Sequence, residues 1–597
     1  MRRTLLDRSP GAREPLLVVP HDASPELRAM AIHEGGWVCD GEADQEEINA
    51  ALSGAARKGG RVLCAAGTYR ITAPILVPSN VELQFAQGNR VTIPETHNFG
   101  QAGNRVTVWQ EPFCAIVRNL HAGDGESGDE GIVLDGMHLD VGAPTGSTKL
   151  PLDVSTGGIL LDGCADSRIV NCTVKDVCYD VSGSIRAYGI ALTRCTDCAI
   201  SGCRTDGSGY EGIGLRSGNK RCTVSGCVGE NNKIHFVQAA RWVGQTHYGE
   251  GIQEDLLIED CRSLTNGIIM HGRGLSPVSR SVIANCRTKW ITLDGLIDNC
   301  GVTANACRQI AVNSSEASMS GVNVSNNALI MEDGVPKAST GIFLDAYADG
   351  GVSKNILIAN NTIAGGNIIM YQREGKSAVY ENVTIQGNVV TYDSTGTLTP
   401  RLIDLGLYGS GTIKQVAILN NRLAGLHQLV PLDYDDTGVY ILLASGSTVN
   451  IQDLLVQNNN IYARYGVRCV TDGAGTITNM LAIGNMFNLL SDVIYLTNTI
   501  KRLAILNNFI QDCTRVVRGP ADDVIIHGNV LVDVRVALFN SATNIAVGIN
   551  MSWKDGVGWN GAWRFKQDDS DADTMYIQKL IDGAWTTAGT FDASPPP

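Results

Sequence analysis

The chain has 597 residues, of which 67 are glycine and 18% are charged, and its formal net charge is -14. It is too apolar to be intrinsically disordered, and its acidic balance argues against a nucleic-acid partner, because phosphate binding depends on Lys and Arg. No apolar run approaches the ~18 residues of a membrane-spanning helix, and the basic N-terminus lacks the apolar core of a signal peptide, so we expect neither.

The N-terminal region is predicted to consist of an arm and a cap. Residues 1–15 contain four arginines and two prolines and read either as a plain basic extension or as a peptide that attaches to another protein. Residues 16–60 are predicted to form a strand and helix cap. A short helix begins at Ser24, and a second helix begins at Asp44, with Glu47 in the capping-box position.

From residue 61 to about residue 550 the sequence repeats a unit of two or three short strands, with no helical periodicity between them. Ile190 lies in a Gly-Ile-Ala-Leu run and is followed thirteen residues later by Cys203; Ile213 lies in a similar run and is followed fourteen residues later by Cys227. Such a unit buries its apolar face only by stacking on its neighbours. The repeat therefore predicts an all-β fold, a single-stranded parallel β-helix (solenoid).

Small residues recur at one internal position of the predicted coils. In the first half this residue is cysteine, and we expect a ladder of buried thiols rather than a disulfide framework or a zinc site, although Cys195 and Cys198 have CxxC spacing. The predicted thiol column is Cys172, Cys203, Cys227, Cys261, Cys286, Cys300 and Cys307. In the second half the residue is asparagine, whose amides can bond to one another at a tight corner: Asn326-Asn327, Asn360-Asn361, Asn388, Asn420-Asn421, Asn458-Asn459, Asn485, Asn507-Asn508, Asn529 and Asn550.

Residues 551–597 are predicted to form a small β-rich module. Four of the eight tryptophans lie there, and Asp582-Gly583 separates two strand-like runs, which is a strong hairpin signal. This Trp-rich hairpin module is either a cap or trimer contact, or a separate sugar-binding domain.

The opening of the chain resembles a known family. Cys39-Asp40-Gly41, the helix after Asp44, Gly59-Gly60 and Ala66-Gly67-Thr68-Tyr69 follow one another as in the pectate-lyase-like superfamily of right-handed parallel β-helix proteins, and the version here is most similar to β-helix proteins of bacteriophage tails and tailspikes. The resemblance implies a right-handed solenoid whose N-terminal helix caps the open end. It implies no reaction, because glycan lyases, hydrolases and adhesins share the fold. The catalytic signatures of polygalacturonases and alginate epimerases are absent.

The predicted coils between residues 188 and 273 contain most of the candidate functional side chains. Aligning the coils on Ile159, Ile190, Ile213, Ile234 and Ile268 predicts an exterior strip that gathers Tyr188, Glu211, Arg216, His235 and His271. Asp206 and Glu230 each lie three residues after a ladder cysteine and are predicted to be stacked carboxylates, as a glycosidase acid and its partner would be. The coil between Cys227 and Cys261 contains a surplus loop suited to sugar contact, with Arg241, Trp242, His247, Tyr248 and Glu250.

These patterns support two functional hypotheses. The first is a phage-type tailspike or tail fibre, a homotrimer that binds and cleaves a bacterial surface polysaccharide; the second is a non-enzymatic virion spike or adhesin that uses the β-helix as a rigid binding scaffold. Hydrolysis would use a carboxylate pair; lyase chemistry would use His235 or Tyr210 as base, with Arg216 or Arg241 neutralising a uronate. The catalytic candidates are Glu211, Asp206, Glu230, His235 and Glu250. The substrate-binding candidates are Tyr188, Tyr210, Arg216, Arg241, Trp242, His247, Tyr248, His271 and Arg273.

Both hypotheses imply the same partners. We expect a virion location, attachment to phage tail or baseplate proteins through the N-terminal arm, and extracellular action on the host glycan. No cofactor and no metal are expected, since the acidic run at 123–130 misses the EF-hand positions and reads as a solvated loop.

Overall fold

The computed structural model describes residues 14–592 except 58–59, 96, 109–110, 124–127, 143–149, 151–153, 178–185, 217, 241–251, 274–276, 316–317, 331–340, 393–399, 426–435, 490, 498–499, 533, 535, 539–541, 552–562, 568–573 and 582–583. The chain divides into two compact units, unit 1 (Met1–Cys307) and unit 2 (Arg308–Pro597). Within the described residues no helix is long and apolar enough to cross a membrane.

Two short helices pack on the first strands of unit 1. Helix α1 (Pro25–His33) has Ser24 as N-cap, and the Ser24 hydroxyl accepts a bond from the Leu27 N–H at 3.3 Å, as predicted. Helix α2 (Gln45–Ala56) buries Ile48 and Leu52 and contacts the strands β1 (Leu16–Val19), β3 (Arg61–Cys64) and β5 (Ile75–Val77). The helix therefore covers these strands with its apolar side, as expected of a helix that caps the solenoid.

The capping box predicted for α2 is wrong. The Asp44 side chain makes no cap bond to the helix. Its two carboxylate oxygens accept the N–H groups of Gly41 and Arg70, each at 2.7 Å, and so join the preceding loop to β4 (Gly67–Arg70). The Asp44 N–H, which Glu47 would bind in a capping box, donates instead to Arg70 O at 2.9 Å.

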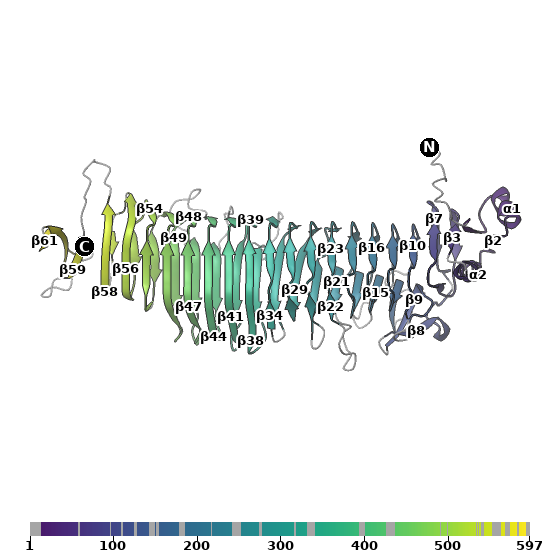
Figure 1. Ribbon diagram of the computed structural model, residues 1–597, viewed down its shortest axis with the longest axis horizontal. Coiled ribbons are helices and arrows are strands. Elements are labelled where there is room, and N and C mark those ends of the chain that lie inside the picture. Colours follow the sequence, from purple (N-terminus) through teal and green to yellow (C-terminus); the bar gives the residue numbers. More distant parts are fainter. Residues whose placement is uncertain are drawn as a thin grey trace. The chain divides into compact units, whose positions relative to one another are not determined.

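The strands of unit 1 form two parallel-stranded faces, which we call sheet A and sheet B, and they follow one another rung by rung in Figure 1. Further strands of sheet A in unit 1 are β2 (Trp37–Val38), β6 (Glu82–Phe85), β7 (Asn89–Thr92), β10 (Val133–Asp135), β11 (His138–Asp140), β13 (Arg168–Val170), β14 (Thr173–Lys175), β16 (Ala199–Ser201), β17 (Arg204–Asp206), β19 (Thr223–Ser225), β20 (Val228–Glu230), β22 (Gln253–Glu254), β23 (Leu257–Glu259), β24 (Arg262–Ser263), β26 (Val278–Ser279), β27 (Val282–Ala284), β28 (Arg287–Thr288), β30 (Ile297–Asp298), β31 (Gly301–Thr303) and β32 (Ala306–Cys307). Those of sheet B, besides β5, are β8 (Arg105–Val108), β9 (Glu111–Asn119), β12 (Ser155–Asp162), β15 (Ala187–Thr193), β18 (Glu211–Arg216), β21 (His235–Ala240), β25 (Ile268–Gly272) and β29 (Trp290–Gly295). Strand β8 departs from the parallel order, because it pairs antiparallel with β9.

Each rung pairs with the next in parallel and in register. Ile159, Ile190 and Ile213 lie opposite one another in β12, β15 and β18, so equivalent residues stack at the ~4.8 Å spacing of neighbouring strands. The strands are too short to bury their apolar side chains singly, and the stacked isoleucines fill the interior instead. This is the right-handed parallel β-helix that the repeat and the resemblance predicted.

The thiol ladder is confirmed for its first five members. The Sγ atoms of Cys203, Cys227 and Cys286 each lie 3.5 to 3.7 Å from a backbone carbonyl of the preceding coil, and these residues are buried and free of disulfides. The prediction is wrong for Cys300 and Cys307, because the residue that follows Cys286 in this column is Asn305, whose Oδ1 accepts the Cys286 N–H at 2.8 Å.

Unit 2 is built in the same way. Its sheet B strands are β33 (Gln309–Ser314), β37 (Gly341–Ala346), β40 (Asn367–Gln372), β43 (Arg401–Leu407), β46 (Thr437–Leu443), β49 (Tyr465–Thr471), β52 (Asp492–Leu496), β55 (Arg515–Arg518) and β57 (Val536–Leu538). Its sheet A strands include β36 (Ala328–Ile330), β38 (Gly351–Ala359), β41 (Ser377–Gln386), β44 (Ser410–Leu419), β45 (Arg422–Ala424), β47 (Asn450–Gln457), β50 (Thr476–Ile483), β53 (Leu503–Leu506), β56 (Ala521–Val532) and β58 (Ala542–Met551).

The asparagine ladder of unit 2 is confirmed from Asn327 to Asn529. Each Nδ2 donates to the Oδ1 of the next ladder residue at 2.9 to 3.0 Å, through Asn361, Asn388, Asn421, Asn459, Asn485 and Asn508. The residue before a ladder position adopts the left-handed backbone, as Asn326 (φ 58°) and Asn420 (φ 55°) do, which turns the chain at the corner.

The C-terminal hairpin is also present. Strand β59 (Trp563–Gln567), β60 (Thr574–Ile581) and β61 (Ala584–Asp592) form an antiparallel sheet in which Ile581 pairs with Ala584. The role predicted for this module stays a prediction.

Candidate functional site on the outer face of sheet B

The strands of sheet B place the predicted site residues in two columns of unit 1. Tyr188, Glu211 and His235 stand opposite one another in β15, β18 and β21. A second column runs from Arg216 through Ala240 to His271 and Asp294. The structure therefore brings together the polar residues of five successive rungs.

The alignment of the fourth coil on Ile234 was wrong by three residues. Val237, not Ile234, pairs with Ile213, and Phe236 takes the place that Gly212 has in the previous rung. Phe236 is fully buried and fits because a side chain is missing at Gly229, where an added Cβ would lie 1.9 Å from the phenyl ring. This packing sets the register and moves His235 directly beside Glu211.

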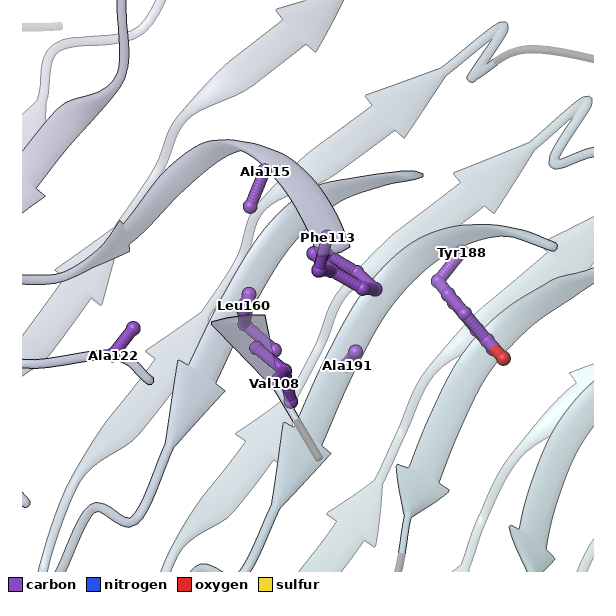
Figure 2. Close-up of a cluster of buried hydrophobic side chains, with 7 residues drawn as sticks. All are labelled: Val108, Phe113, Ala115, Ala122, Leu160, Tyr188 and Ala191. Atoms are coloured by element: carbon purple, nitrogen blue, oxygen red, sulfur yellow. The ribbon is translucent and has the colours of Figure 1, made fainter. Parts of the chain in front are cut away.

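Tyr188, Glu211 and Arg216 are fully buried, so the prediction that they lie on an exterior strip is wrong. Tyr188 stacks on Phe113 with ring centroids 6.1 Å apart and belongs to an apolar cluster with Val108 of β8 and Leu160 of β12. Figure 2 shows the seven side chains of this cluster. The side chains point outward from the rungs, as predicted, but apolar neighbours cover them.

Arg216 occupies the centre of the buried group. Its guanidinium is hydrogen-bonded to Glu211 Oε1, donates to Gln238 Oε1 at 3.2 Å and lies 5.2 Å from the centre of the Tyr188 ring and 5.8 Å from that of Tyr210. An ion pair taken out of water in this way needs both partners, since either charge left alone would carry a large desolvation penalty. Glu211 is thus the counter-ion of Arg216 and has a structural role.

Next to this group the site opens to solvent. His235 is partly exposed, and its ring meets Trp290 edge to face with centroids 5.1 Å apart. Burial, followed by the nearby charges of Arg216 and His271, lowers the pKa of His235 to about 4. The ring is therefore neutral near pH 7, and its Nδ1 accepts or donates no bond among the described residues.

His271 forms a second imidazole centre on β25, one rung after His235. Its Nε2 accepts a bond from Arg273 Nε at 2.7 Å and lies 3.1 Å from Asp294 Oδ2. The same nitrogen cannot accept a bond from Arg273 and donate one to Asp294. Because burial lowers the pKa of His271, we assign a neutral ring whose Nε2 is unprotonated and accepts the bond from Arg273. Arg273 is exposed and presents its remaining N–H groups to solvent.

The predicted carboxylate pair lies elsewhere. Asp206 of β17 pairs directly with Glu230 of β20, which confirms that the two are stacked one coil apart. They belong to sheet A, whereas the histidines belong to sheet B. Arg204 binds Glu230 at 2.5 Å, and Asp206 accepts a bond from Asn231 Nδ2 at 2.9 Å.

The five loop candidates, Arg241, Trp242, His247, Tyr248 and Glu250, lie outside the described residues. The loop leaves the sheet directly after Ala240, which stands between Arg216 and His271 in their column. It returns at Gln253, whose Nε2 donates to Leu215 O at 2.8 Å and to Ala240 O at 3.3 Å.

Trp290 and Asp294 were missed as site residues. Both stand on β29, one rung after His271, and Asp294 pairs directly with it. Extending the isoleucine alignment by one coil, to Ile291, would have placed Asp294 in the column of His271. Trp290 lies one residue before Ile291, outside the two aligned positions.

One group of described residues could hold a metal ion: Cys39, Asp44 and Glu47, whose ligand atoms lie within 4.8 Å of one another. Both Asp44 oxygens already accept backbone N–H groups. The Asp44 carboxylate therefore has a structural role in joining these backbone segments.

Solved structures that are similar to this chain include two carbohydrate-related proteins and an adhesin. The catalytic unit of a GH87 α-1,3-glucanase from Streptomyces thermodiastaticus is 15% identical with a TM-score of 0.37 and covers 76% of this chain and 70% of its own. The tailspike protein of the E. coli bacteriophage HK620, as a mutant in complex with a pentasaccharide, is 10% identical with a TM-score of 0.36, covering 90% and 80%. PfbA, a surface adhesin of Streptococcus pneumoniae, is 11% identical with a TM-score of 0.26, covering 92% and 96%.

The chain is a parallel β-helix protein. No family model and no curated protein matches the sequence. The likeness to the solved structures concerns the fold, on which hydrolases and adhesins both occur, so the function must be argued from the site.

Proposed function

We propose that this protein is a phage-type tailspike or tail fibre that binds a bacterial surface polysaccharide, and that the outer face of sheet B in unit 1 cleaves it. The observation that carries the proposal is the partly exposed row of His235, Trp290, His271 and Arg273, beside the origin of the inserted loop. Aromatic faces, an exposed cation and neutral imidazoles are the groups that a sugar-cleaving groove requires.

The available groups favour elimination over hydrolysis. Glu211 is held by Arg216, and the Asp206–Glu230 pair lies in sheet A, so no described carboxylate pair faces the histidines. His235 is unprotonated at pH 7, so its ring can accept a proton. It would remove the proton next to the carboxylate of a uronic acid; the C–H electrons form the C=C bond, and the glycosidic oxygen leaves and takes up a proton. Arg273 would bind the uronate carboxylate, the role first assigned to Arg216 or Arg241.

The proposal is tested by incubating the protein with a panel of capsular polysaccharides and lipopolysaccharides. Lyase action produces new reducing ends together with the absorbance of unsaturated uronates, and hydrolysis produces reducing ends alone. His235→Gln should lower the rate by about 10²- to 10⁴-fold. His138→Gln, which changes a half-buried histidine in sheet A of the same unit, is the matched control and should cleave normally.

The second candidate is a spike that binds glycan without cleaving it. The buried Glu211–Arg216 pair favours it, because a fully covered ion pair is a structural feature and not a reactive one. Retention of a glycan on the protein with no new reducing ends and no unsaturated product would establish this candidate and overturn the first.

We also propose that the chain forms a homotrimer through sheet A of unit 2. A groove with a volume of about 600 Å³ lies there, lined by the apolar column Leu455, Leu481, Ala504 and Ile525 with Asp453, Arg502 and Asp523 at its edge. Ile525 is 49% exposed. A contiguous apolar surface of this kind marks an interaction site, and its mixed charges can pair with those of a second copy. The N-terminal arm, residues 1–15, would attach the trimer to the phage tail or baseplate.

A further inference from the structure

The outer face of sheet B in unit 2 carries a column of alternating aromatic and charged side chains. Asp404, Tyr440, Arg468, Tyr495 and Arg518 stand opposite one another in the successive strands β43, β46, β49, β52 and β55. None of them is among the site residues predicted from the sequence. The column lies in a different unit from the histidines of the proposed cleavage site.

The arginines lie against the tyrosine rings. The Arg468 guanidinium carbon is 5.9 Å from the centre of the Tyr440 ring and 5.3 Å from that of Tyr495, and Arg518 is 5.0 Å from Tyr495. Arg401, beside the column, lies 3.7 Å from Tyr440. Such contacts hold the guanidinium planes in fixed positions, so that little side-chain entropy remains to be lost when an anion binds.

The ends of the column have unused bonding capacity. Asp404 accepts a bond from Arg401 at 3.2 Å through Oδ2, while its buried Oδ1 has no partner among the described residues. Burial, as the largest cause, raises the pKa of this carboxyl. At the other end Arg518 is 45% exposed and its nearest carboxylate, Asp492, is 3.9 Å away and already bound by Arg515 at 2.8 Å. An orphaned buried acceptor calls for a hydroxyl or N–H donor, and an exposed guanidinium calls for an anion.

From these contacts we infer that this face of unit 2 is a second binding site, which takes an acidic oligosaccharide. Sugar hydroxyls bond to Asp404, whose side chain is 14% exposed, and sugar carboxylates pair with Arg401 and Arg518. The partly exposed Tyr495 contacts a pyranose ring, whereas the buried Tyr440 supports Arg401 and Arg468 from below. Four rungs separate Asp404 from Arg518, about 19 Å at the usual strand spacing. A ligand that reaches both ends is therefore an oligosaccharide and not a single sugar. The arginines of this column gather on a chain whose net charge is -14. An acidic glycan can form ion pairs with them, whereas a neutral glycan cannot.

The inference is independent of whether unit 1 cleaves glycan. Calorimetric titration of the full chain with oligogalacturonate and with oligosialic acid, each against a malto-oligosaccharide of equal length, tests it. At least one acidic probe should bind, more weakly as salt is raised, and the neutral probe should not. Arg518→Gln and Tyr495→Leu should each raise Kd by about tenfold or more, because each removes a charge-assisted bond or its support.

A control variant shows whether the binding belongs to this face. Arg422→Gln removes an exposed arginine from β45 of sheet A in the same unit and should leave Kd unchanged. Melting temperatures of all variants show whether a loss of binding comes from loss of fold. Binding of neither acidic probe, equal binding of the neutral probe, or an unchanged Kd in a folded Arg518→Gln would overturn the inference.

Discussion

Single residues of the unit 1 site differ mainly in how they are solvated. Glu211 and Arg216 are fully covered and paired with each other, whereas His235 and His271 remain partly exposed. One column thus holds Glu211, a member of a buried ion pair, and one rung later His235, a neutral imidazole. The distinction decides which substitutions affect stability and which affect chemistry.

Glu211→Gln should destabilise the protein, because it leaves the buried Arg216 without its counter-ion. Breaking a buried pair costs on the order of 3–5 kcal/mol, which scanning calorimetry would detect as a lowered melting temperature. Glu211→Gln combined with Arg216→Met should recover part of the loss, since no buried charge then stands alone. Additive losses in the double variant would contradict the pairing.

The depressed pKa of His235 predicts a pH dependence of stability. In the unfolded chain His takes up its proton near pH 6.5, whereas His235 in the folded chain does so only near pH 4. The unfolded state therefore binds more protons between these values, and stability falls as the pH drops from 6.5 to 4, by on the order of 2–3 kcal/mol. The fall should be smaller in His235→Gln than in the parent when melting is measured at pH 7, 5.5 and 4. An exposed-site control, His33→Gln, should fall as the parent does.

At the scale of elements, the ladders hold neighbouring rungs together. From Asn361 to Asn508 each ladder asparagine of unit 2 donates one amide bond to the next ladder residue and one to a backbone carbonyl of the preceding coil, as Asn421 does to Asn459 and to Ile385. Each of these also receives the previous amide on Oδ1, so a single side chain bonds to two neighbouring coils. In unit 1 the thiols fill the same kind of position with bulk and weak S–H bonds.

Asn421→Ala should therefore lower the free energy of unfolding by about 1–3 kcal/mol or more, because it leaves buried partners on both neighbouring rungs unsatisfied. Chemical denaturation followed by far-UV circular dichroism measures the change. Asn323→Ala removes an exposed asparagine from a strand of the same unit and should change stability by less than about 0.5 kcal/mol. Equal effects of the two substitutions would mean that the ladder contributes nothing beyond surface asparagines.

At the scale of the whole molecule, the surface of each unit divides into faces with different chemistry. Sheet B presents the histidines in unit 1 and the tyrosine–arginine column in unit 2, while sheet A of unit 2 presents the apolar groove. Within unit 2 the proposed ligand site and the proposed assembly face therefore lie on different sheets.

Ile525→Asp should disrupt that association by placing a charge in the apolar groove. Light scattering at micromolar concentration should give three chains for the parent protein and fewer for the variant. Ile330→Asp, at another exposed isoleucine, on β36, should leave the assembly intact. A parent protein that scatters as one chain would remove the trimer from the proposal.

The repeated positions of the sequence determined the solenoid, the first five thiols and the asparagine ladder, because in a stacked fold each such residue meets its own equivalent one rung away. They also sufficed to pair Asp206 with Glu230. What covers an outward side chain depends on contacts from elsewhere in the chain, and only the tertiary structure showed that Phe113 and Val108 pack around Tyr188 beside the buried Glu211–Arg216 pair. The register of β21 was likewise decided by Phe236 packing over Gly229. A sequence period predicts contacts between equivalent residues of successive rungs. It does not predict these contacts, because they join residues that occupy different positions of the repeat.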